Sequence, residues 1–386
     1  MKIKVLHIVG TMNRGGAEVM LMDIHRNISD KFHFDFLINY RSQSGKPNGD
    51  FDQEIISKDS KLIYIQAQWD QGVLNYIRSF KKIIQEFGLP DIVQIHLNAK
   101  SGVVAMAAKK AGIKKVIVHS HAALRIRGSI MYIILARMEL IFQKILISRY
   151  SDYFFGCSAE ANESLFFKKL LKTSKTTIIN NAIDVNSFSS VSEVEILELR
   201  KKWGASPQTI IFGNVGRVVA HKNILFLLDV LSLYKQFNDD FLLVIAGRIE
   251  DQKYLQLFLE KAGRHSLVDK IRILGIRADT QLIYRSFDIF LGPALNEGFG
   301  MVAVEAQAAA LPAILSGGFP QTVDMGIGLV RFISDFEAKK WVDAILDIEL
   351  RSLDFDLIKA KISLKGFDIN TNVKEIEKIY EAIIKN

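Results

Sequence analysis

The sequence predicts an α/β protein of two domains, each with a parallel sheet that is covered by helices on both faces. Apolar strand-like runs alternate with segments of helical periodicity, which is typical of parallel sheets. The same rhythm restarts after Pro207. A chain of 386 residues is also longer than one ordinary core requires, so two domains of about 190 residues each are expected.

The first half opens with a β-branched run, Ile3–Val9, which predicts a strand, a glycine-containing turn and a helix from about Ala17. An apolar stripe at helical spacing follows over 73–87 and ends at a glycine and a proline. The elements expected after it are a strand at 91–97, a helix at 101–112 and a strand at 115–118.

The second half is expected to contain a strand at 209–213, a helix at 224–237, and strands at 241–246, 271–274 and 288–292. Residues 184–206 are polar and lack a strand pattern, so they are interpreted as an interdomain link with a short helix. The ligands of such sheets bind outside the carboxyl ends of the strands, which makes the strand-end loops the candidate site.

Composition and charge limit the possible partners and compartment. A net charge of +8 and a pI near 9.2 favour nucleotide diphosphates, nucleic acid or an acidic membrane face. Nucleic acid is excluded from the prediction because the sequence has no zinc-ligand cysteine pattern, basic helix or RNP-like strand. The single cysteine, Cys157, excludes an internal disulfide, and no signal peptide or membrane-length apolar run is recognised. A cytoplasmic protein is expected.

The stretch NEGFGMVAVEAQAAAL is the most informative part of the chain. Gly298 and Gly300 form a turn before a helix that begins at Met301, and the amides of such a helix N-terminus suit an anion. Glu297 and Glu305 stand eight positions apart around this turn. Solvated surface glutamates are the alternative, but Glu305 sits in an otherwise apolar helix, where a carboxylate needs partners. The pattern therefore predicts a site for an anion flanked by hydroxyls, as in a nucleotide sugar.

Two cations follow the strand at 209–213, in GNVGRVVAHKN. Arg217 can form a bidentate fork on phosphate, and Lys222 adds a compact charge. Solvated loop cations are the ordinary alternative. Gly15 and Gly16 also stand at a predicted helix N-terminus, where they could admit a phosphate or the acceptor or form a mere turn; the dinucleotide-binding spacing is absent.

Three histidines end neighbouring strands: His96, His119 and His121. The last two project to one side of the strand, because they are two residues apart. Each could be a structural histidine, and the three together could bind a metal. The metal interpretation is set aside because no carboxylate or cysteine accompanies them at ligand spacing. The Asp354–Asp356 pair is interpreted as a solvated surface rather than a metal-binding DxD motif.

The chain resembles retaining glycosyltransferases of family 4, which have the two-domain GT-B fold with facing Rossmann-like sheets. The resemblance covers nearly the whole chain, through VLHIVGTMNRGGAE, DIVQIHLN, VIVHSHAA, GNVGRVVAHKN, LLVIAG, FDIFLGPALNEGFG and FDINTNVKEIEKIYEAI. It is strongest to bacterial enzymes that build capsular and exopolysaccharide units. By this resemblance, domains are expected at 1–185 and 186–367, with a C-terminal helix at about 368–386 joining the first.

The resemblance also implies roles for the candidate residues. Arg217 and Lys222 would offset the leaving diphosphate, Glu297 would hold the donor sugar and Glu305 the ribose. His121 would contact the donor sugar, although the HSH sequence leaves an ambiguity with His119. The further donor-binding residues are Gly15, Gly16, Gly298, Phe299, Gly300, Met301 and Val302, and His96 is a possible sugar contact.

The implied reaction is metal-independent transfer with retention and without a cofactor. The donor would be a nucleotide sugar, with UDP expected, and the acceptor a saccharide or an undecaprenyl-type lipid-linked saccharide. Three segments depart from the family pattern: Ala310 replaces a common glycine, Gly292–Ala294 replaces a common Pro-Ser, and SGGFPQTVDMG differs on the donor side. A nucleotide-sugar epimerase and a catalytically silent nucleotide-binding subunit stay open as alternatives.

Residues 125–150 mix apolar side chains with cations that include Arg125, Arg127, Arg137, Lys144 and Arg149. Such a segment could lie on an anionic bilayer, in peripheral, salt-sensitive contact. A core helix packed on the first sheet is the favoured interpretation.

Overall fold

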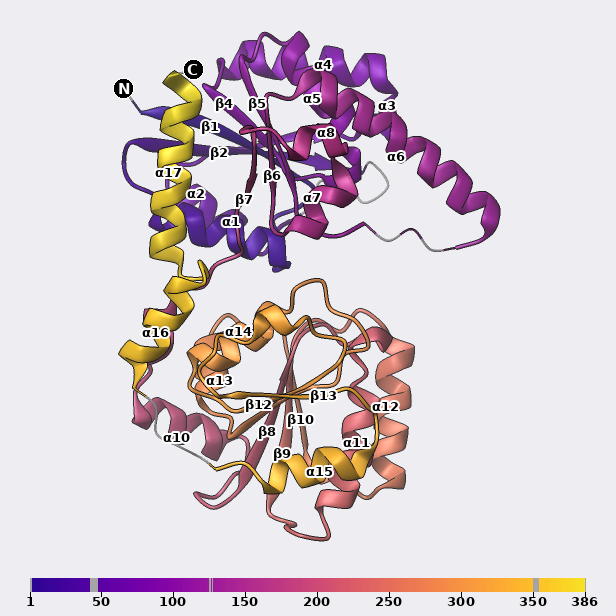
Figure 1. Ribbon diagram of the computed structural model, residues 1–386, viewed down its shortest axis with the longest axis vertical. Helices are drawn as coiled ribbons and strands as arrows, with labels where there is room; N and C mark the ends of the chain where they lie inside the picture. The colour runs from indigo at the N-terminus through magenta and orange to yellow at the C-terminus, as the bar shows by residue number, and fades with distance from the viewer. Residues whose placement is uncertain (1, 42–47, 125, 127, 350–353, 386) are drawn as a thin grey trace. The chain divides into compact units, whose positions relative to one another are not determined.

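Two parallel sheets, one in each of two units of the chain, carry the fold (Figure 1). The computed structural model describes residues 2–41, 48–124, 126, 128–349 and 354–385. The first unit is Met1–Ala182 with Ile369–Asn386, and the second is Ile183–Asp368. The sequence-based boundaries, 1–185 and 186–367 with a segment from about 368, remain a prediction beside this division.

The first unit has the strand order β3-β2-β1-β4-β5-β6-β7, and each pairing in it is parallel. The strands are β1 Ile3–Val9, β2 Phe32–Tyr40, β3 Leu62–Gln66, β4 Ile92–Ile95, β5 Lys115–Ser120, β6 Tyr153–Gly156 and β7 Thr176–Ile178. The helices are α1 Gly16–Asn27, α2 Asp52–Ser57, α3 Gln68–Gln71, α4 Val73–Phe87, η2 Asn98–Lys100, α5 Ser101–Lys110, α6 Ile130–Tyr150, α7 Ala159–Leu165, α8 Lys168–Leu171 and α17 Ile369–Lys385.

Alternate side chains of the strands face opposite layers of this unit, as the twofold period of a strand requires. Val5, Ile92 and Ile117 face a core that α1 and α17 complete. Their neighbours, such as Leu6 and Val93, face a second core that α4 and α5 complete. The near-continuous apolar strands recognised in the sequence are therefore buried on both faces.

Helix α17, yellow in Figure 1, packs its apolar stripe on the first sheet beside α1. Its buried side chains include Val373, Ile376, Tyr380 and Ile383. These side chains recur at helical spacing, so they form one apolar face of the helix.

Truncation after Phe367 is expected to abolish soluble expression, because it uncovers the core face that α17 closes. Ile376→Ser should cost about 2–4 kcal/mol of unfolding free energy, the range for large losses in a core. The matched control is Ile384→Ser on the same helix, since Ile384 is 37% exposed and Ile376 only 3%. Soluble yield and urea unfolding measure both effects. A well-folded truncation would refute this role of α17.

The second unit has the strand order β10-β9-β8-β11-β12-β13, again with parallel pairings. The strands are β8 Ile210–Val215, β9 Phe241–Ala246, β10 Ile271–Gly275, β11 Ile289–Gly292, β12 Ala313–Ser316 and β13 Val330–Ile333. The helices are α9 Val185–Ser189, α10 Glu193–Lys202, η3 Ala220–Lys222, α11 Ile224–Tyr234, α12 Gln252–Arg264, η4 Val268–Lys270, α13 Thr280–Arg285, α14 Met301–Ala308, η5 Gln321–Val323, α15 Ala338–Leu346 and α16 Phe355–Leu364.

The predicted α/β class with two parallel sheets is confirmed. The segment 184–206, interpreted as an interdomain link with a short helix, contains two helices and is not a link for most of its length. Helices α9 and α10 occupy it and belong to the second unit. A capping box between Ser192 and Glu195 starts α10, which is the serine-to-glutamate spacing that such a box needs.

Candidate active site

Each sheet has a switch point, where the strand order reverses and the loops on either side lead away in opposite directions. In the second unit it lies between β8 and β11, which are neighbours in the sheet. The loops after these strands lie side by side, because the amide of Leu295 donates to the carbonyl of His221 at 2.8 Å. Ligands of doubly wound sheets bind at this position.

Lys222 and Glu297 form an ion pair across these two loops. Their side chains are only 14% and 11% exposed. Together with Val302, Gly292 and Asn214 they line a hollow at the carboxyl ends of β8 and β11. A largely buried charge pair beside a hollow is a stronger sign of a site than a surface ion pair. Removing two charges from water is costly, and buried charged groups cluster at functional sites.

The turn before α14 depends on its glycines. Gly300 caps the helix with φ at 92°, a conformation that favours glycine, and an added Cβ would lie 2.6 Å from the ring of Phe319. The carbonyl of Gly318 accepts a hydrogen bond from the amide of Glu297 at 2.9 Å. The glycine-rich segment after β12, which departs from the family pattern, therefore contacts and supports the turn that contains Glu297.

Glu305 lies on α14 and accepts a 2.7 Å hydrogen bond from the hydroxyl of Tyr284. Tyr284 is fully buried, and burial and then the Glu305 charge raise its pKa well above its usual range, so it remains a donor. Glu305 is thus the partnered carboxylate that its apolar helix required.

Arg217 does not join the Lys222–Glu297 pair. Its guanidinium forms a 3.0 Å ion pair with Glu250, and its side chain is 54% exposed. Of the other predicted donor residues, those at 298–302 lie in the turn before α14 and in its first residues. Phe299 stacks on Phe367 at 4.9 Å between ring centroids, and Met301 and Val302 begin the helix.

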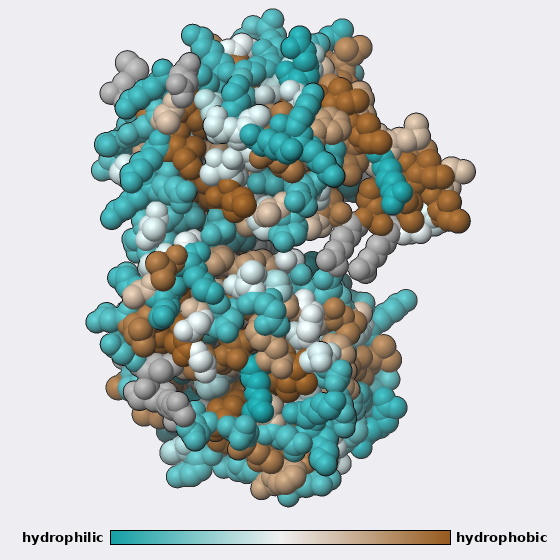
Figure 2. Space-filling model, viewed as in Figure 1, coloured by the Kyte–Doolittle hydropathy of each residue, from teal (hydrophilic) through white to brown (hydrophobic). Residues whose placement is uncertain are grey.

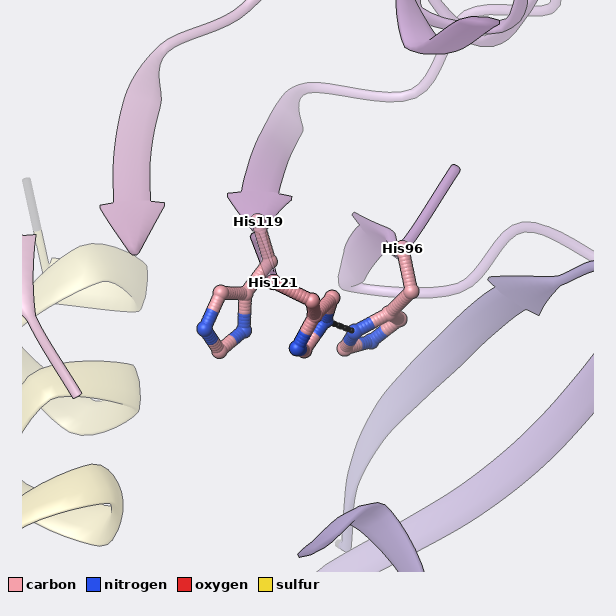
Figure 3. A group of neighbouring side chains, drawn as sticks. All are labelled: His96, His119 and His121. Carbon is pink, nitrogen blue, oxygen red and sulfur yellow. Dashed lines mark hydrogen bonds between the residues drawn. The ribbon is translucent and has the colours of Figure 1, made fainter. Parts of the chain in front are cut away.

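The three predicted histidines, His96, His119 and His121, form one cluster at the ends of β4 and β5 (Figure 3). His96 Nδ1 and His121 Nε2 are 2.7 Å apart, and His96 Nε2 is 3.0 Å from Nδ1 of His7. The His119 and His121 rings stack at 4.1 Å. Burial lowers the pKa of His121 to about 4 and that of His96 and His119 well below the usual range, so all three are neutral at pH 7.

The same three histidines are the metal-ligand group that the described part of the chain offers, with one ring nitrogen from each within 4.8 Å of the others. Both nitrogens of His96 are already in hydrogen bonds, as is Nδ1 of His119. A metal bound by all three rings would have to replace at least one of these bonds. The histidines were predicted to face the site together, and the structure does bring them together.

Gly15 and Gly16 stand at the start of α1, as expected. The carboxylate of Glu18 lies against Gly15, where an added Cβ would be 2.4 Å from Oε2. Burial raises the pKa of Glu18. An anion approaching these amides would meet this side chain, so the predicted phosphate contact stays a prediction.

The Asp354–Asp356 pair has a structural role. The side chain of Asp354 caps α16 and accepts a 2.9 Å hydrogen bond from the amide of Asp356. Four residues that bond to the predicted site residues or to their partners were not predicted from the sequence. Tyr284 donates to Glu305, and the histidine cluster is extended by His7, Gln94 and Tyr380. Gln94 carried a signal, because it lies two residues before His96 and so faces the same side of β4.

Comparison with known proteins shows which family the chain belongs to. The family model described as "Glycosyl transferases group 1" matches residues 195–359. The chain is 30% identical to EpsF of Bacillus subtilis (strain 168) over 380 residues, covering 98% of this chain and 96% of EpsF. It is 27% identical to the capsular polysaccharide biosynthesis glycosyltransferase CapH of Staphylococcus aureus over 381 residues, with 98% of each chain covered.

Among solved structures, the chain is similar to Anabaena Alr3699/HepE in complex with UDP and glucose. The TM-score is 0.76 at 18% identity, and the match covers 98% of this chain and 99% of that one. This similarity extends the fold assignment over nearly the whole chain.

Proposed function

Since this chain belongs to the glycosyl transferases group 1 family, we propose that it transfers a sugar, with retention, from a UDP-sugar to a saccharide or undecaprenyl-type lipid-linked saccharide. The reaction would serve surface polysaccharide biosynthesis. The name of CapH supports that process, and the UDP and glucose held by the HepE structure support the donor class.

The Lys222–Glu297 pair carries this proposal. Breaking a sugar–phosphate bond leaves positive charge at the anomeric carbon and negative charge on the diphosphate. A cation held at the hollow stabilises the leaving diphosphate more in the transition state than in the ground state. The adjacent Glu297 would accept from donor-sugar hydroxyls, while Glu305, one helical turn into α14, would accept from the ribose.

Retention would follow if the acceptor hydroxyl attacks on the face that the diphosphate leaves. The anomeric C–O bond to phosphate breaks, the new C–O bond to the acceptor forms, and the acceptor proton passes to the departing phosphate oxygen. Lys222 and Arg217 would offset the phosphate charge, so the proposed reaction uses no metal or cofactor.

The function is tested by incubating the protein with a panel of nucleotide sugars, with and without a lipid-linked acceptor, in buffer containing a chelator. Release of the nucleoside diphosphate only with acceptor supports transfer, and the anomeric coupling of the product reports retention. An altered sugar without release would indicate an epimerase. Binding without turnover would indicate a silent subunit, and loss of activity with chelator would refute metal independence.

Glu305→Gln is expected to weaken binding of UDP about tenfold, because an amide is a poorer acceptor than a carboxylate for the ribose hydroxyls. Tyr284→Phe should weaken it less, since the phenol acts only through Glu305. Isothermal titration measures both. If Glu305→Gln bound UDP normally while Glu297→Gln did not, the roles of the two glutamates would be inverted.

Helix α6 supports a second part of the proposal, a peripheral membrane contact. The core-helix interpretation was wrong for most of this helix, since only Gln143 and Ile147 are buried in it. Its exposed large apolar side chains are Ile130, Met131, Tyr132, Ile134, Leu135, Met138, Ile141, Phe142 and Ile145. Figure 2 shows a brown, hydrophobic surface over α6. The described residues contain no helix that is both long and apolar enough to cross a bilayer.

We propose that this α6 surface lies in the headgroup region of an anionic bilayer. Arg137 and Arg149 are exposed along it, while Glu139 is paired with Lys100. Arg125 and Arg127, which the sequence placed in the same segment, lie outside the described residues. Apolar burial and cationic attraction act together at such an interface.

Vesicles with anionic lipid are expected to bind the protein, with salt removing only part of the binding because the apolar contact is not screened. The paired substitution Leu135→Glu/Met138→Glu should reduce the bound fraction at least about tenfold. Leu364→Glu is the matched control, an apolar residue 84% exposed on α16. Cosedimentation measures binding. A dimer that dissociates in the paired variant, without vesicle binding, would assign the surface to a second copy instead.

A further inference from the structure

Tyr380, Gln94 and His119 form a buried hydrogen-bond relay from the last helix to the end of β5. The hydroxyl of Tyr380 donates to Oε1 of Gln94, and Nε2 of Gln94 lies 3.0 Å from Nδ1 of His119. The three side chains are 2%, 4% and 1% exposed. Tyr380 and Gln94 are far apart in sequence and come together because α17 packs on the face of the sheet that Gln94 and His119 share.

The chemistry of the carboxamide fixes the direction of this relay. Its oxygen only accepts, so it accepts the hydrogen bond from the Tyr380 hydroxyl, and its NH₂ group only donates. Nδ1 of His119 therefore accepts and carries no proton. Because the buried ring is neutral, its single proton must be on Nε2.

Nε2 of His119 is buried and has no hydrogen-bond partner among the described residues. A buried N–H without an acceptor is destabilising. The unpaired Nε2–H of His119, in a cluster at the ends of the strands, therefore indicates an acceptor supplied from outside the chain. The ring also stacks on His121, whose own buried Nδ1 finds no hydrogen-bond partner in the described part of the chain.

We propose that Gln94 and Tyr380 are positioning residues that hold His119 in its Nε2–H form, ready to donate to an oxygen of the bound sugar. The catalytic consequence rests on the proposed transfer function, whereas the protonation state of the ring does not. The final helix thereby has a second role besides closing the core: it supplies the hydroxyl that sets the hydrogen-bonding character of a residue in the site.

The relay also makes a metal at His119 unfavourable. Metal binding through Nε2 would move the ring proton to Nδ1, which would then face the donor group of Gln94. Reversing the carboxamide would in turn present its NH₂ group to the tyrosine hydroxyl, which would lose its acceptor.

The direct test is ¹⁵N NMR of histidine-labelled protein, with the His119 signals assigned by their loss in His119→Gln. The wild-type ring should give a pyridine-type Nδ1 and a pyrrole-type Nε2. In Tyr380→Phe and Gln94→Met this assignment should shift toward a mixture of the two forms. A pyrrole-type Nδ1 in the wild type would overturn the proposal, and so would co-purifying metal whose chelation shifts Nε2.

Transfer assays give the second readout. Tyr380→Phe should lower kcat about fivefold to tenfold, the scale of one lost hydrogen bond, with UDP affinity unchanged. Tyr76→Phe is the matched control, because Tyr76 is equally buried in the same unit but its hydroxyl makes no hydrogen bond to the described residues. Equal losses in the two variants would mean a purely structural role. If no donor is ever turned over, the NMR result still decides the relay while the proposed function fails.

Discussion

Lys222→Ala is expected to lower the transfer rate on the order of 10²–10³, the usual loss for one preorganised group that stabilises developing charge. The position of Lys222 is the reason for this large effect. Lys222 is only 14% exposed and lines the hollow beside α14, so its charge acts where water is scarce. Binding of UDP should weaken too, because in the proposed site the same charge would contact the diphosphate in the ground state.

The comparison with Arg217 sharpens this prediction. Arg217 is 54% exposed and paired with Glu250, so Arg217→Ala should cost about tenfold or less. Equal effects of the two substitutions would mean that Arg217 turns to the diphosphate when the donor binds.

A folding control is needed because Lys222→Ala leaves Glu297 largely buried without its cation. The double variant Lys222→Met/Glu297→Gln removes both charges and should recover most of the lost stability without recovering activity. Lys261→Ala is the matched control for ion-pair loss, since Lys261 pairs with Asp229 at 2.5 Å in the same unit. Normal transfer by Lys222→Ala would place the catalytic cation elsewhere.

Patterns local in sequence predicted the fold and part of the site. The strands followed from apolar runs, and the acidic turn followed from glycines before a helix start, since both depend on near neighbours. The Lys222–Glu297 pair could have been predicted in the same way, because adjacent parallel strands end at one edge of a sheet.

Contacts between distant segments were not predictable. Tyr284 and Glu305 lie on different helices, and nothing in either segment indicates the other. The direction of Arg217 depended on Glu250, which follows another strand. The core-helix interpretation of α6 was wrong for a different reason. Its apolar residues surround the helix rather than forming one stripe, so the sequence does not indicate which side is covered.

Acidification is expected to unfold the first unit before the second. Four buried histidines of the first unit and the half-buried His121 have pKa values lowered by burial: His7 to about 3, His25 and His121 to about 4, and His96 and His119 well below the usual range. In the second unit, His221 has its pKa lowered too, but its side chain is exposed.

The sign follows from proton linkage. An unfolded histidine binds a proton near pH 6.5, whereas these folded rings bind one only at much lower pH, so the unfolded state holds more protons in between. Their contribution is fully present above about pH 6.5 and is lost as the pH falls toward the folded value. Each ring costs about 1.4 kcal/mol per pH unit in that window, against a total stability of about 5–15 kcal/mol.

Hydrogen exchange at pH 7, 6 and 5 is the measurement that distinguishes the units. Amides of β1 and β4 should lose protection by about pH 5, while those of β8 and β11 keep it. His25→Gln removes one titrating ring outside the site cluster, and it should recover about 2 kcal/mol of the loss between pH 6.5 and 5. His265→Gln in the second unit should leave the first unit's profile unchanged. If β1 and β4 stayed protected at pH 5, the histidines would have to be protonated in the folded chain, and their burial would not exclude the charge.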